Sequence, residues 1–521
     1  MREDIHKKKI AAGASIVASA TALSRVLGYT RDMAIAYYFG AGALSDAFFV
    51  AFRISNLLRR LVGEGALTSS FIPIFQEERT RRDDAELKGL ISGVFTLITL
   101  ILLVLTFLGI FFSENLVALM SPGFLENPAK FTLTVNLTRL MFPYMIFVGL
   151  MAIGMGILNS LRHFTAPALA PVFFNIAIIL SILIVSPFLT HPVYALAIGV
   201  LLGGAMQFAI MLPWLRRYGF LPEFSLNFRD SAILKIFKLM GPAAFGVGIY
   251  QLNIFITLWF ASGLAEGSVS FLYYSGRLME LPLGIFGVAI STVALPGLAE
   301  YAAKEHWSAF MDSLLYALRL VLFLTIPAAI GLIILSPSII DVLFAHGEFN
   351  EGATSSTAWA LYFYAPGLVP VALYRIFTSA FYSLKDTVTP VAVAVVTLII
   401  NLFFCIVLVG PMKHAGLAFA TTISALFNMV ILFYLLRRKL HGFTGEGLFL
   451  SAMKNIIAAI LMSIAVYLIF YGMGFNESRG LVNILSLGGT IIVGVIIYLL
   501  SSKLLKVPEV AFLKGFFIKG R

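Results

Sequence analysis

The sequence predicts an all-α polytopic membrane protein with about fourteen transmembrane helices. Of its 521 residues, 60% are hydrophobic and only 12% are charged, and the mean hydropathy is +0.95. A soluble chain of this length could not bury so much apolar surface. Apolar runs of about 18 residues or more recur from end to end, and each could cross a hydrocarbon core about 30 Å thick. The alternation typical of a membrane β-barrel is absent.

Division at charges and at Gly/Pro breaks gives the individual spans. The first apolar run continues past Arg25 without a cleavage site, so we interpret it as an uncleaved first helix and not a signal peptide. The fourteen spans lie at about 10–39, 43–75, 90–112, 131–160, 166–187, 192–215, 233–262, 268–299, 313–336, 355–383, 388–410, 415–436, 453–473 and 482–502. No predicted loop is large enough for a soluble catalytic domain.

The distribution of Lys and Arg orients these spans. With a cytoplasmic N-terminus, about 25 of the 37 Lys and Arg fall in inside segments, and three fall outside: Lys130, Lys413 and Arg479. Both termini are therefore predicted to be cytoplasmic. The net charge of +11 is mainly this topology signal, so no nucleic-acid partner is expected. The single cysteine, Cys405, excludes internal disulfides and a cysteine metal cluster, and no metal ligands can be assigned.

An internal repeat divides the chain. SLRHFTAP at 160–167 matches SLKDTVTP at 383–390, an offset of 223, and LRRYGF at 215–220 matches LRRKLHGF at 436–443 at nearly the same offset. We therefore predict an N-lobe of six helices at 1–222 and a C-lobe of six helices at 223–445. Two extra helices follow at 446–521. Because six is even, the lobes share one orientation and should be related by a pseudo-two-fold axis along the membrane normal.

Repeats of this kind commonly place a substrate site between the halves and expose it alternately to the two sides of the membrane. The alternative is a duplicated scaffold without transport, and the charges inside the spans argue against it. Spans one, two and eight carry Arg25, Arg31, Arg53, Arg59, Arg60 and Arg277 together with Asp32, Asp46, Glu64 and Glu280. Each charge at the bilayer centre costs roughly 2.5–3.5 kcal/mol on insertion scales. Such residues must pair, line a water-filled cavity, or do both.

Helical spacing permits four ion pairs, which are Arg25 with Asp32, Asp46 with Arg53, Arg60 with Glu64, and Arg277 with Glu280. On this structural reading, Arg25, Arg53 and Arg60 mainly fix helix packing. Arg31 points about 100° away from Asp32, and Arg59 has no carboxylate three or four residues away, so neither has an obvious partner. Arginines of this kind suit a cavity that receives an anion. The planar guanidinium matches phosphate oxygens, so we predict a phosphorylated, anionic headgroup as the substrate.

Four stretches of this sequence resemble the MurJ (MviN) lipid II flippases of the multidrug/oligosaccharidyl-lipid/polysaccharide exporter superfamily. They are SRVLGYTRD, FGAGALSDAFFVAFRISNLLRRLVGEGALTSSFIPIF, SVSFLYYSGRLMELPLGIFGVAISTVALPGLA and AFYSLKDTVTP. They cover both predicted lobes, and the fourteen spans agree with this family, whereas related exporters usually have twelve.

The resemblance implies a flippase that moves lipid-linked peptidoglycan precursor (lipid II) from the cytoplasmic to the periplasmic leaflet by alternating access. Lipid II is a disaccharide-pentapeptide on undecaprenyl diphosphate. The family's cavity residues match Arg25, Arg31, Arg59, Arg277 and Ser270, with supporting acids at Asp32, Asp46, Glu64 and Glu280. The two C-terminal helices would form a groove for the lipid tail. The protein would lie in the bacterial cytoplasmic (inner) membrane, among membrane lipids, with cell-wall synthesis proteins as further candidate partners.

The resemblance leaves the energy source open. No organic cofactor is expected, and coupling could use a monovalent cation such as sodium or the membrane potential. Some relatives bind sodium between spans seven and eleven through acidic and amide side chains. Here span seven offers Gln251, Asn253 and Thr257, and span eleven offers Thr397 and Asn401, but neither offers a carboxylate. Gly276 also stands where some relatives carry an acid.

Two other functions are compatible with parts of the pattern. One is an exporter of another undecaprenyl-diphosphate-linked glycan, or of drugs. The other is a membrane glycosyltransferase or polymerase, which would need a catalytic carboxylate on an outside loop. The outside loops are short but contain Glu114, Asp341 and Glu348.

Overall fold

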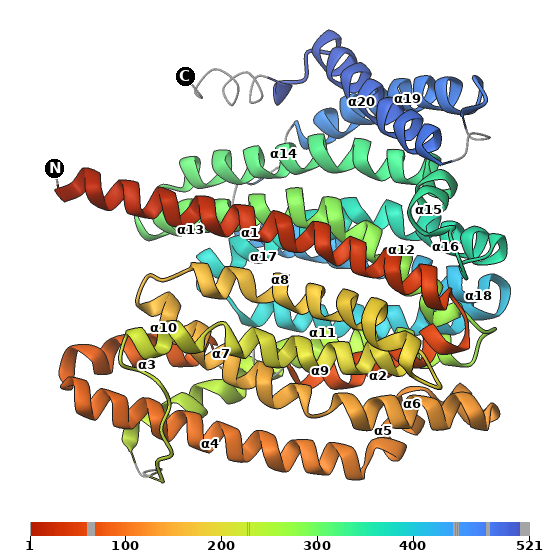
Figure 1. Cartoon of the computed structure of the whole chain (residues 1–521). Coiled ribbons are helices and arrows are strands. Elements are labelled where there is room, and N and C mark those ends of the chain that lie inside the picture. The colour runs from red at the N-terminus through yellow and green to blue at the C-terminus, as the bar shows by residue number, and fades with distance from the viewer. Residues whose placement is uncertain are drawn as a thin grey trace. The chain divides into compact units, whose positions relative to one another are not determined.

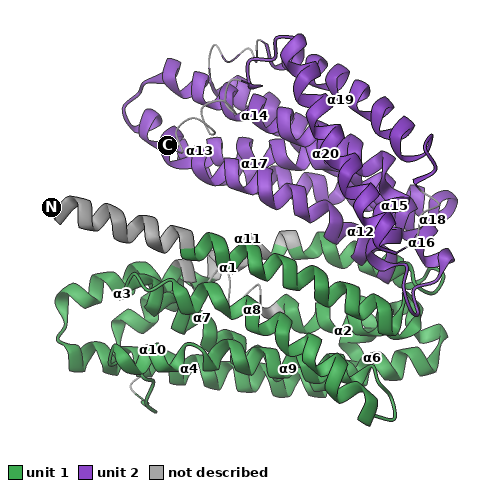
Figure 2. Ribbon diagram, turned by 45° about the horizontal axis from the view of Figure 1, so that its top comes forward, with its two compact units in different colours: residues 1–269 green, residues 270–521 purple. Residues whose placement is uncertain are grey.

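The computed structural model describes residues 2–59, 68–226, 228, 230–440, 443, 445, 447–475 and 480–510. Throughout these residues the chain forms helices and turns, without a strand (Figure 1). The all-α polytopic class predicted from composition is therefore confirmed. The chain divides into two compact units, residues 1–269 and 270–521 (Figure 2).

The described residues of the first unit contain eleven α-helices and three short turns of 3₁₀- or π-helix. They are α1 (Arg2–Phe39), α2 (Ala43–Arg59), α3 (Thr68–Arg81), α4 (Asp84–Phe111), α5 (Ser113–Met120), η2 (Pro122–Glu126), α6 (Pro128–Met141), α7 (Tyr144–Ser160), α8 (Thr165–Leu180), η3 (Ser181–Val185), η4 (Ser186–Phe188), α9 (Tyr194–Ala209), α10 (Leu212–Arg217) and α11 (Ser231–Ser262). Glycines let α9 approach its neighbours closely. A Cβ on Gly203 would lie 2.7 Å from the Phe174 ring of α8, and one on Gly204 would lie 2.5 Å from the Tyr144 ring of α7.

The second unit begins within α12 and contains the remaining helices. They are α12 (Ser268–Pro282), η5 (Leu283–Val288), α13 (Ala289–Ala303), α14 (Trp307–Ile334), α15 (Ser336–Phe344), α16 (Glu351–Tyr364), η6 (Ala365–Gly367), α17 (Leu368–Ser383), α18 (Val388–Lys439), α19 (Leu448–Phe470) and α20 (Leu481–Leu504). The long element α18 is two helices joined at a kink, where Lys413 has φ 52° and ψ −131°.

Ten described segments are long and apolar enough to cross a membrane. They cover eleven of the predicted spans, because α18 contains both the span at 388–410 and the span at 415–436. The other three predicted spans fall on α1, on α2 with α3, and on α11. The total of fourteen remains a prediction. The predicted lobe boundary at residue 222 also remains a prediction. It was placed by the sequence repeat, whereas the division at residue 269 separates two compactly packed parts of the structure.

The repeat has a structural counterpart in the two matching loops. Arg162 and Lys385 occupy equivalent positions and both adopt left-handed backbone, with φ 60° and 58°. The next amide in each loop donates back to a helix carbonyl, from His163 to Leu158 (2.8 Å) and from Asp386 to Phe381 (2.9 Å). Two segments 223 residues apart therefore end their helices in the same way.

The side chains of these two loops differ. Burial and the charge of Arg217 lower the pKa of His163, whose ring contacts the Trp214 ring in a tilted arrangement with 4.0 Å between centroids. Burial by itself would raise the pKa of Asp386, but the bonds from Lys439 and Thr389 outweigh it and bring this pKa to about 2. The two copies of the repeat therefore share the backbone conformation of this loop, but the residue after the left-handed position is a histidine in one copy and an aspartate in the other.

The segment that connects α10 to α11 forms hydrogen bonds and an ion pair with one face of α4. Ser92 Oγ accepts from the Glu223 amide at 3.2 Å, and Thr96 Oγ1 accepts from the Ser225 amide at 3.0 Å. Lys88, one turn earlier, pairs with the Glu223 carboxylate. The spacing of four residues places all three α4 side chains on the same face. The segment therefore has defined partners even though it lies between helices.

Arg82 forms ion pairs at the C-terminal end of this segment. Its guanidinium donates to both Asp230 oxygens, at 2.5 and 2.9 Å, and to Glu78 at 2.6 Å. The bond from Arg82 holds the pKa of Asp230 below its usual value despite partial burial. Asp230 also caps the start of α11 by accepting from the Ala232 amide.

A proline in α14 explains how α20 is attached to the second unit. Pro327 has no N–H, so the carbonyl of Phe323, four residues earlier, lacks its helical donor. The hydroxyl of Tyr498 on α20 donates to that carbonyl at 2.7 Å. Asn455 on α19 lies 3.0 Å from the same hydroxyl. Three helices therefore meet at one satisfied backbone group.

Replacing Tyr498 with Phe should lower the thermal unfolding temperature in detergent. The change leaves a buried carbonyl without a donor and should cost about 1–2 kcal/mol. Tyr434→Phe, at a side chain that is 62% exposed, is the matched control and should melt like the parent protein. Equal melting of Tyr498→Phe and parent would contradict this account of the attachment.

Candidate functional site

Arg31 and Asp32 of α1 form a hydrogen-bonded group with α8 inside the first unit. Arg31 donates to Asp32 Oδ1 from Nε (3.0 Å) and from Nη2 (2.6 Å). Its Nη1 donates to Asn175 of α8 at 3.0 Å, and Asn175 in turn donates to the carbonyl of Ser24. Asp32 is fully buried and Arg31 is 8% exposed. The buried carboxylate is therefore compensated by its neighbour in sequence.

This arrangement corrects two expectations drawn from helical spacing. Arg31, predicted to lack a partner, pairs with Asp32, because its long side chain curls back across the 100° that separates adjacent residues. Arg25, which spacing paired with Asp32, forms no ion pair with any described residue and is half-buried. Of the two arginines, Arg31 therefore has an ion-pair partner among the described residues, whereas Arg25 does not.

The arginines of α2 are described unequally. Arg53 is half-buried, and its predicted pairing with Asp46 stays a prediction. Arg59 is the last residue of α2, and its side chain lies outside the described part of the chain. Arg60 and Glu64 lie outside the described residues.

In the second unit, α12 carries the predicted pair at Arg277. Arg277 Nη1 donates to Glu280 at 2.9 Å, which confirms the spacing argument. The two side chains are 29% and 56% exposed, so this ion pair is partly solvated and contributes little to stability. Ser270, one element of the predicted site, is fully buried in the same helix.

Asp46 has a partner that sequence reasoning missed. Lys130, assigned above to an outside loop, lies in the first turn of α6 and is 9% exposed. Its Nζ lies 2.8 Å from Asp46 Oδ2, and the amide of Gly267 donates to the same oxygen at 2.8 Å. The available signal was the NPAK sequence: Asn127 and Pro128 start a helix, which carries Lys130 into the apolar run that follows.

A group of neutral polar side chains lies between the two arms of α18. Ser424 Oγ donates to the Thr397 carbonyl at 2.8 Å, and Asn428 donates to Thr397 Oγ1 at 3.2 Å. The Asn428 oxygen is buried without a hydrogen bond. These oxygens could ligate a monovalent cation, but they bring no compensating charge. No group of three or more His, Cys, Asp or Glu that could hold a metal occurs in the part of the chain described here.

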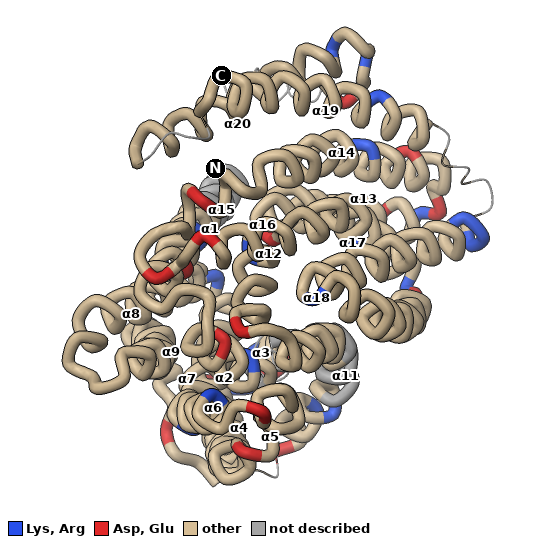
Figure 3. The backbone as a smooth tube through the Cα atoms, turned by 90° about the vertical axis from the view of Figure 1, so that its right-hand side faces the viewer, with Lys and Arg blue, Asp and Glu red and all other residues tan. Residues whose placement is uncertain are grey.

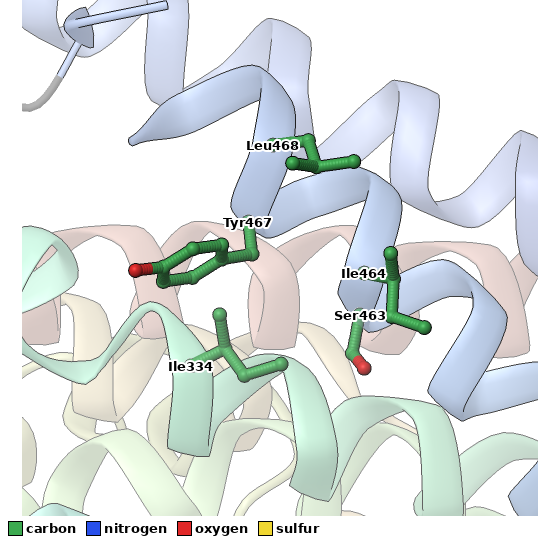
Figure 4. Close-up of a pocket in the computed structure, with 5 residues that line it drawn as sticks. All are labelled: Ile334, Ser463, Ile464, Tyr467 and Leu468. Carbon is green, nitrogen blue, oxygen red and sulfur yellow. The ribbon is translucent and has the colours of Figure 1, made fainter. Parts of the chain in front are cut away.

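The C-terminal helices are largely apolar and exposed, as expected for surfaces that face lipid. α19 borders a pocket of about 280 Å³ with the end of α14 (Figure 4). Its lining is Ile334, Ser463, Ile464, Tyr467 and Leu468. The pocket is open and mostly hydrocarbon, which suits an alkyl or prenyl chain better than a polar group.

Lys and Arg are sparse along most helices and recur near helix ends (Figure 3). Long apolar helices with a few buried, paired charges define a polytopic membrane protein of the transporter type. The model of the family described as "Lipid II flippase MurJ" matches residues 35–500. The chain belongs to this family.

Curated relatives agree over most of their length. The chain is 37% identical over 468 residues to a protein of Vibrio cholerae named "Probable lipid II flippase MurJ", covering 88% of each chain. It is also 37% identical over 430 residues to "Lipid II flippase MurJ" of Burkholderia cenocepacia, covering 81% of this chain and 83% of that one. The family resemblance of the sequence motifs is therefore confirmed.

Solved structures show the same fold. "Lipid II flippase MurJ, inward closed conformation" matches with a TM-score of 0.79 and 27% identity, over 94% of this chain and 98% of that one. An inward-facing multidrug resistance MATE family transporter matches with a TM-score of 0.65 at 16% identity, covering 83% and 99%. The second likeness concerns the fold alone.

Replacing Asn175 with Leu should destabilise the first unit. The change leaves an Arg31 donor buried without its acceptor, at a cost of about 1.5–3 kcal/mol for a bond to a charged group. Thermal unfolding of the purified protein measures this cost. Asn159→Leu is the control, because the Asn159 side chain forms no hydrogen bond with a described residue. Similar melting of the two variants would show that Asn175 does not hold Arg31.

Proposed function

We propose that this protein translocates lipid II from the cytoplasmic to the periplasmic leaflet by alternating access. A central cluster of Arg25, Arg31, Arg59 and Arg277, with Ser270, would bind the diphosphate headgroup. The observation that carries the proposal is Arg25: inside a family named for lipid II flippases, it is half-buried in α1 and no described carboxylate pairs with it. A guanidinium in that situation favours a bound phosphate oxygen.

The acidic residues have supporting roles in this proposal. Asp32 orients Arg31, and Glu280 holds Arg277 at the solvated surface of α12 until a phosphate competes for it. Asp46 and Glu64 complete the acidic set. The lobes at 1–222 and 223–445, and the cavity that their arginines would line, are part of this proposal.

The C-terminal helices at 446–521 would hold the lipid tail. The apolar pocket between α14 and α19 supports this assignment, because its lining suits the polyprenyl chain of such a lipid. The protein would lie in the bacterial inner membrane with both termini in the cytoplasm, as the Lys and Arg distribution favours. Coupling would use the membrane potential or a monovalent cation, without an organic cofactor. Lipid II, membrane lipids and cell-wall synthesis proteins would be its partners.

Two of the three candidate carboxylates of the enzyme alternative have partners in the structure. Asp341 accepts a hydrogen bond from Asn483 of α20 at 3.0 Å, and Glu114 lies 3.9 Å from Arg139. Both therefore have structural partners. An exporter of another undecaprenyl-diphosphate-linked glycan, or of drugs, would use the same fold. Cell lysis on depletion would favour lipid II, whereas survival with altered surface glycan would favour that alternative.

Transport of labelled lipid II across vesicles that contain only this protein tests the proposal, with and without an imposed potential. Arg25→Ala and Arg277→Ala should each slow transport by roughly 10- to 150-fold, the equivalent of about 1.5–3 kcal/mol per charged hydrogen bond. Arg25→Lys should recover only part of the rate, because lysine lacks the planar fork.

Arg139→Ala is the control for these variants, since Arg139 is 43% exposed, lies 3.9 Å from Glu114 and donates a hydrogen bond to the neutral Ser113 hydroxyl, outside the proposed site. It should transport at the parent rate. Full transport by Arg25→Ala and Arg277→Ala, at normal protein levels, would rule out the arginine site.

A further inference from the structure

The turn between α11 and α12 is fastened to the start of α2 inside the first unit. Glu266 Oε1 accepts from the Ala43 amide at 2.6 Å, where the first residue of α2 has no helical acceptor. Three residues after Ala43, Asp46 accepts from the Gly267 amide at 2.8 Å. Each bond joins a carboxylate of one turn to an amide of the other.

These two bonds link positions separated by the repeat offset. Ala43 and Glu266 are 223 residues apart, and Asp46 and Gly267 are 221 apart. The α1–α2 turn therefore contacts its own equivalent in the second copy of the repeat. In a repeat with two-fold symmetry, equivalent positions meet only at the axis, so the predicted pseudo-two-fold axis would pass through this junction.

Lys130 supplies the positive charge at this junction. Its Nζ is 2.8 Å from Asp46 Oδ2 and 4.2 Å from the centroid of the Phe124 ring. The side chains of Lys130 and Asp46 are 9% and 1% exposed. The Lys130 amide donates to Asn127, the cap residue of α6, which fixes the backbone that carries the ammonium group.

A buried carboxylate needs both a countercharge and hydrogen-bond donors. Asp46 Oδ2 obtains the countercharge from Lys130 and a donor from the Gly267 amide, at the same distance. Losing Lys130 would leave a buried charge with less compensation, which favours water entry and separation of the turn. α12, which carries Ser270 and Arg277, begins at Ser268, directly after Gly267.

We infer that Lys130 is a positioning residue for transport. Through its ion pair it holds the Asp46 carboxylate on the Gly267 amide, and so keeps the α11–α12 turn closed against α2. We call Asp46, Lys130 and Gly267 the Asp46 clasp. A role in transport requires that the protein transports a lipid, so this inference rests on the proposed function.

Thiol labelling of Ser268→Cys measures whether the clasp is closed. Ser268 is 2% exposed next to Gly267, and Cys405→Ser removes the native thiol. In this background, purified in nanodiscs, Lys130→Met should raise the rate of maleimide labelling at least roughly tenfold and slow lipid II transport. Lys130→Arg keeps the charge and should restore slow labelling.

A charge-swapped variant separates positioning from simple stabilisation. Asp46→Lys with Lys130→Asp restores an ion pair but presents an ammonium to the Gly267 amide, which needs an acceptor. Thermal stability should therefore return toward the parent value, while labelling stays fast and transport stays slow. If the swap restores slow labelling and full transport, the pair is merely structural and the inference is wrong.

Controls keep the two proposals distinguishable. Arg139→Met, in the same helix α6 with an exposed and long ion pair, should label and transport like the parent. Ala265→Cys, on the exposed part of the turn, should label rapidly in every variant. Unchanged labelling in Lys130→Met overturns the clasp. If the parent fails to move lipid II, the proposed function fails, and the labelling comparison still decides whether Lys130 closes the turn.

Discussion

Compensation of charge within an apolar chain is the constraint on which the described structure depends. A buried carboxylate is tolerated only where donors and a countercharge are fixed beside it. Asp32 is compensated by the adjacent Arg31, and Asp46 by Lys130 from a different helix. Each solution fixes the packing of several elements, because Arg31 also reaches Asn175 of α8 and Asp46 also reaches Gly267. The same residues that permit charge in the membrane therefore set the geometry of the first unit.

The backbone obeys the same rule of compensation. Pro327 removes one donor from α14, and the Tyr498 hydroxyl replaces it from α20. The connection along α4 satisfies its amides with the hydroxyls of Ser92 and Thr96. In both places a hydroxyl on a membrane helix forms a hydrogen bond with the backbone of a neighbouring segment. A hydroxyl within an apolar run can therefore have a structural role and need not contact a substrate.

The sequence could predict the features that depend on composition and periodicity. The all-α class, most span positions and the Arg277–Glu280 pair follow from hydropathy and helical spacing, and the motifs identify the family. The repeat was visible because SLRHFTAP and SLKDTVTP share Ser, Leu, a basic residue and Pro at matching positions, and the structure shows that the basic residue adopts left-handed backbone in both copies. These features are local, so a linear sequence contains them.

Contacts between distant segments could not be predicted. Spacing rules treat a side chain as fixed at its helical angle, so they paired Asp32 with Arg25 and missed the flexible Arg31. Lys130 was assigned to a loop because charge is usually solvated, and only the fold brings it to Asp46, 84 residues earlier. The roles of Arg59, Arg60 and Glu64 stay predictions, since their side chains lie outside the described residues.

The kink of α18 has a consequence for biogenesis. Its two apolar arms meet near Pro411 and Lys413 with almost no intervening loop. The direct connection lets the two arms insert into the bilayer together as one helical hairpin, which the bonds of Ser424 and Asn428 to Thr397 hold closed. Because both arms are helical, their backbone groups are satisfied within the hairpin itself. Insertion of this part of the chain would then proceed by a pair of helices and not by one helix at a time.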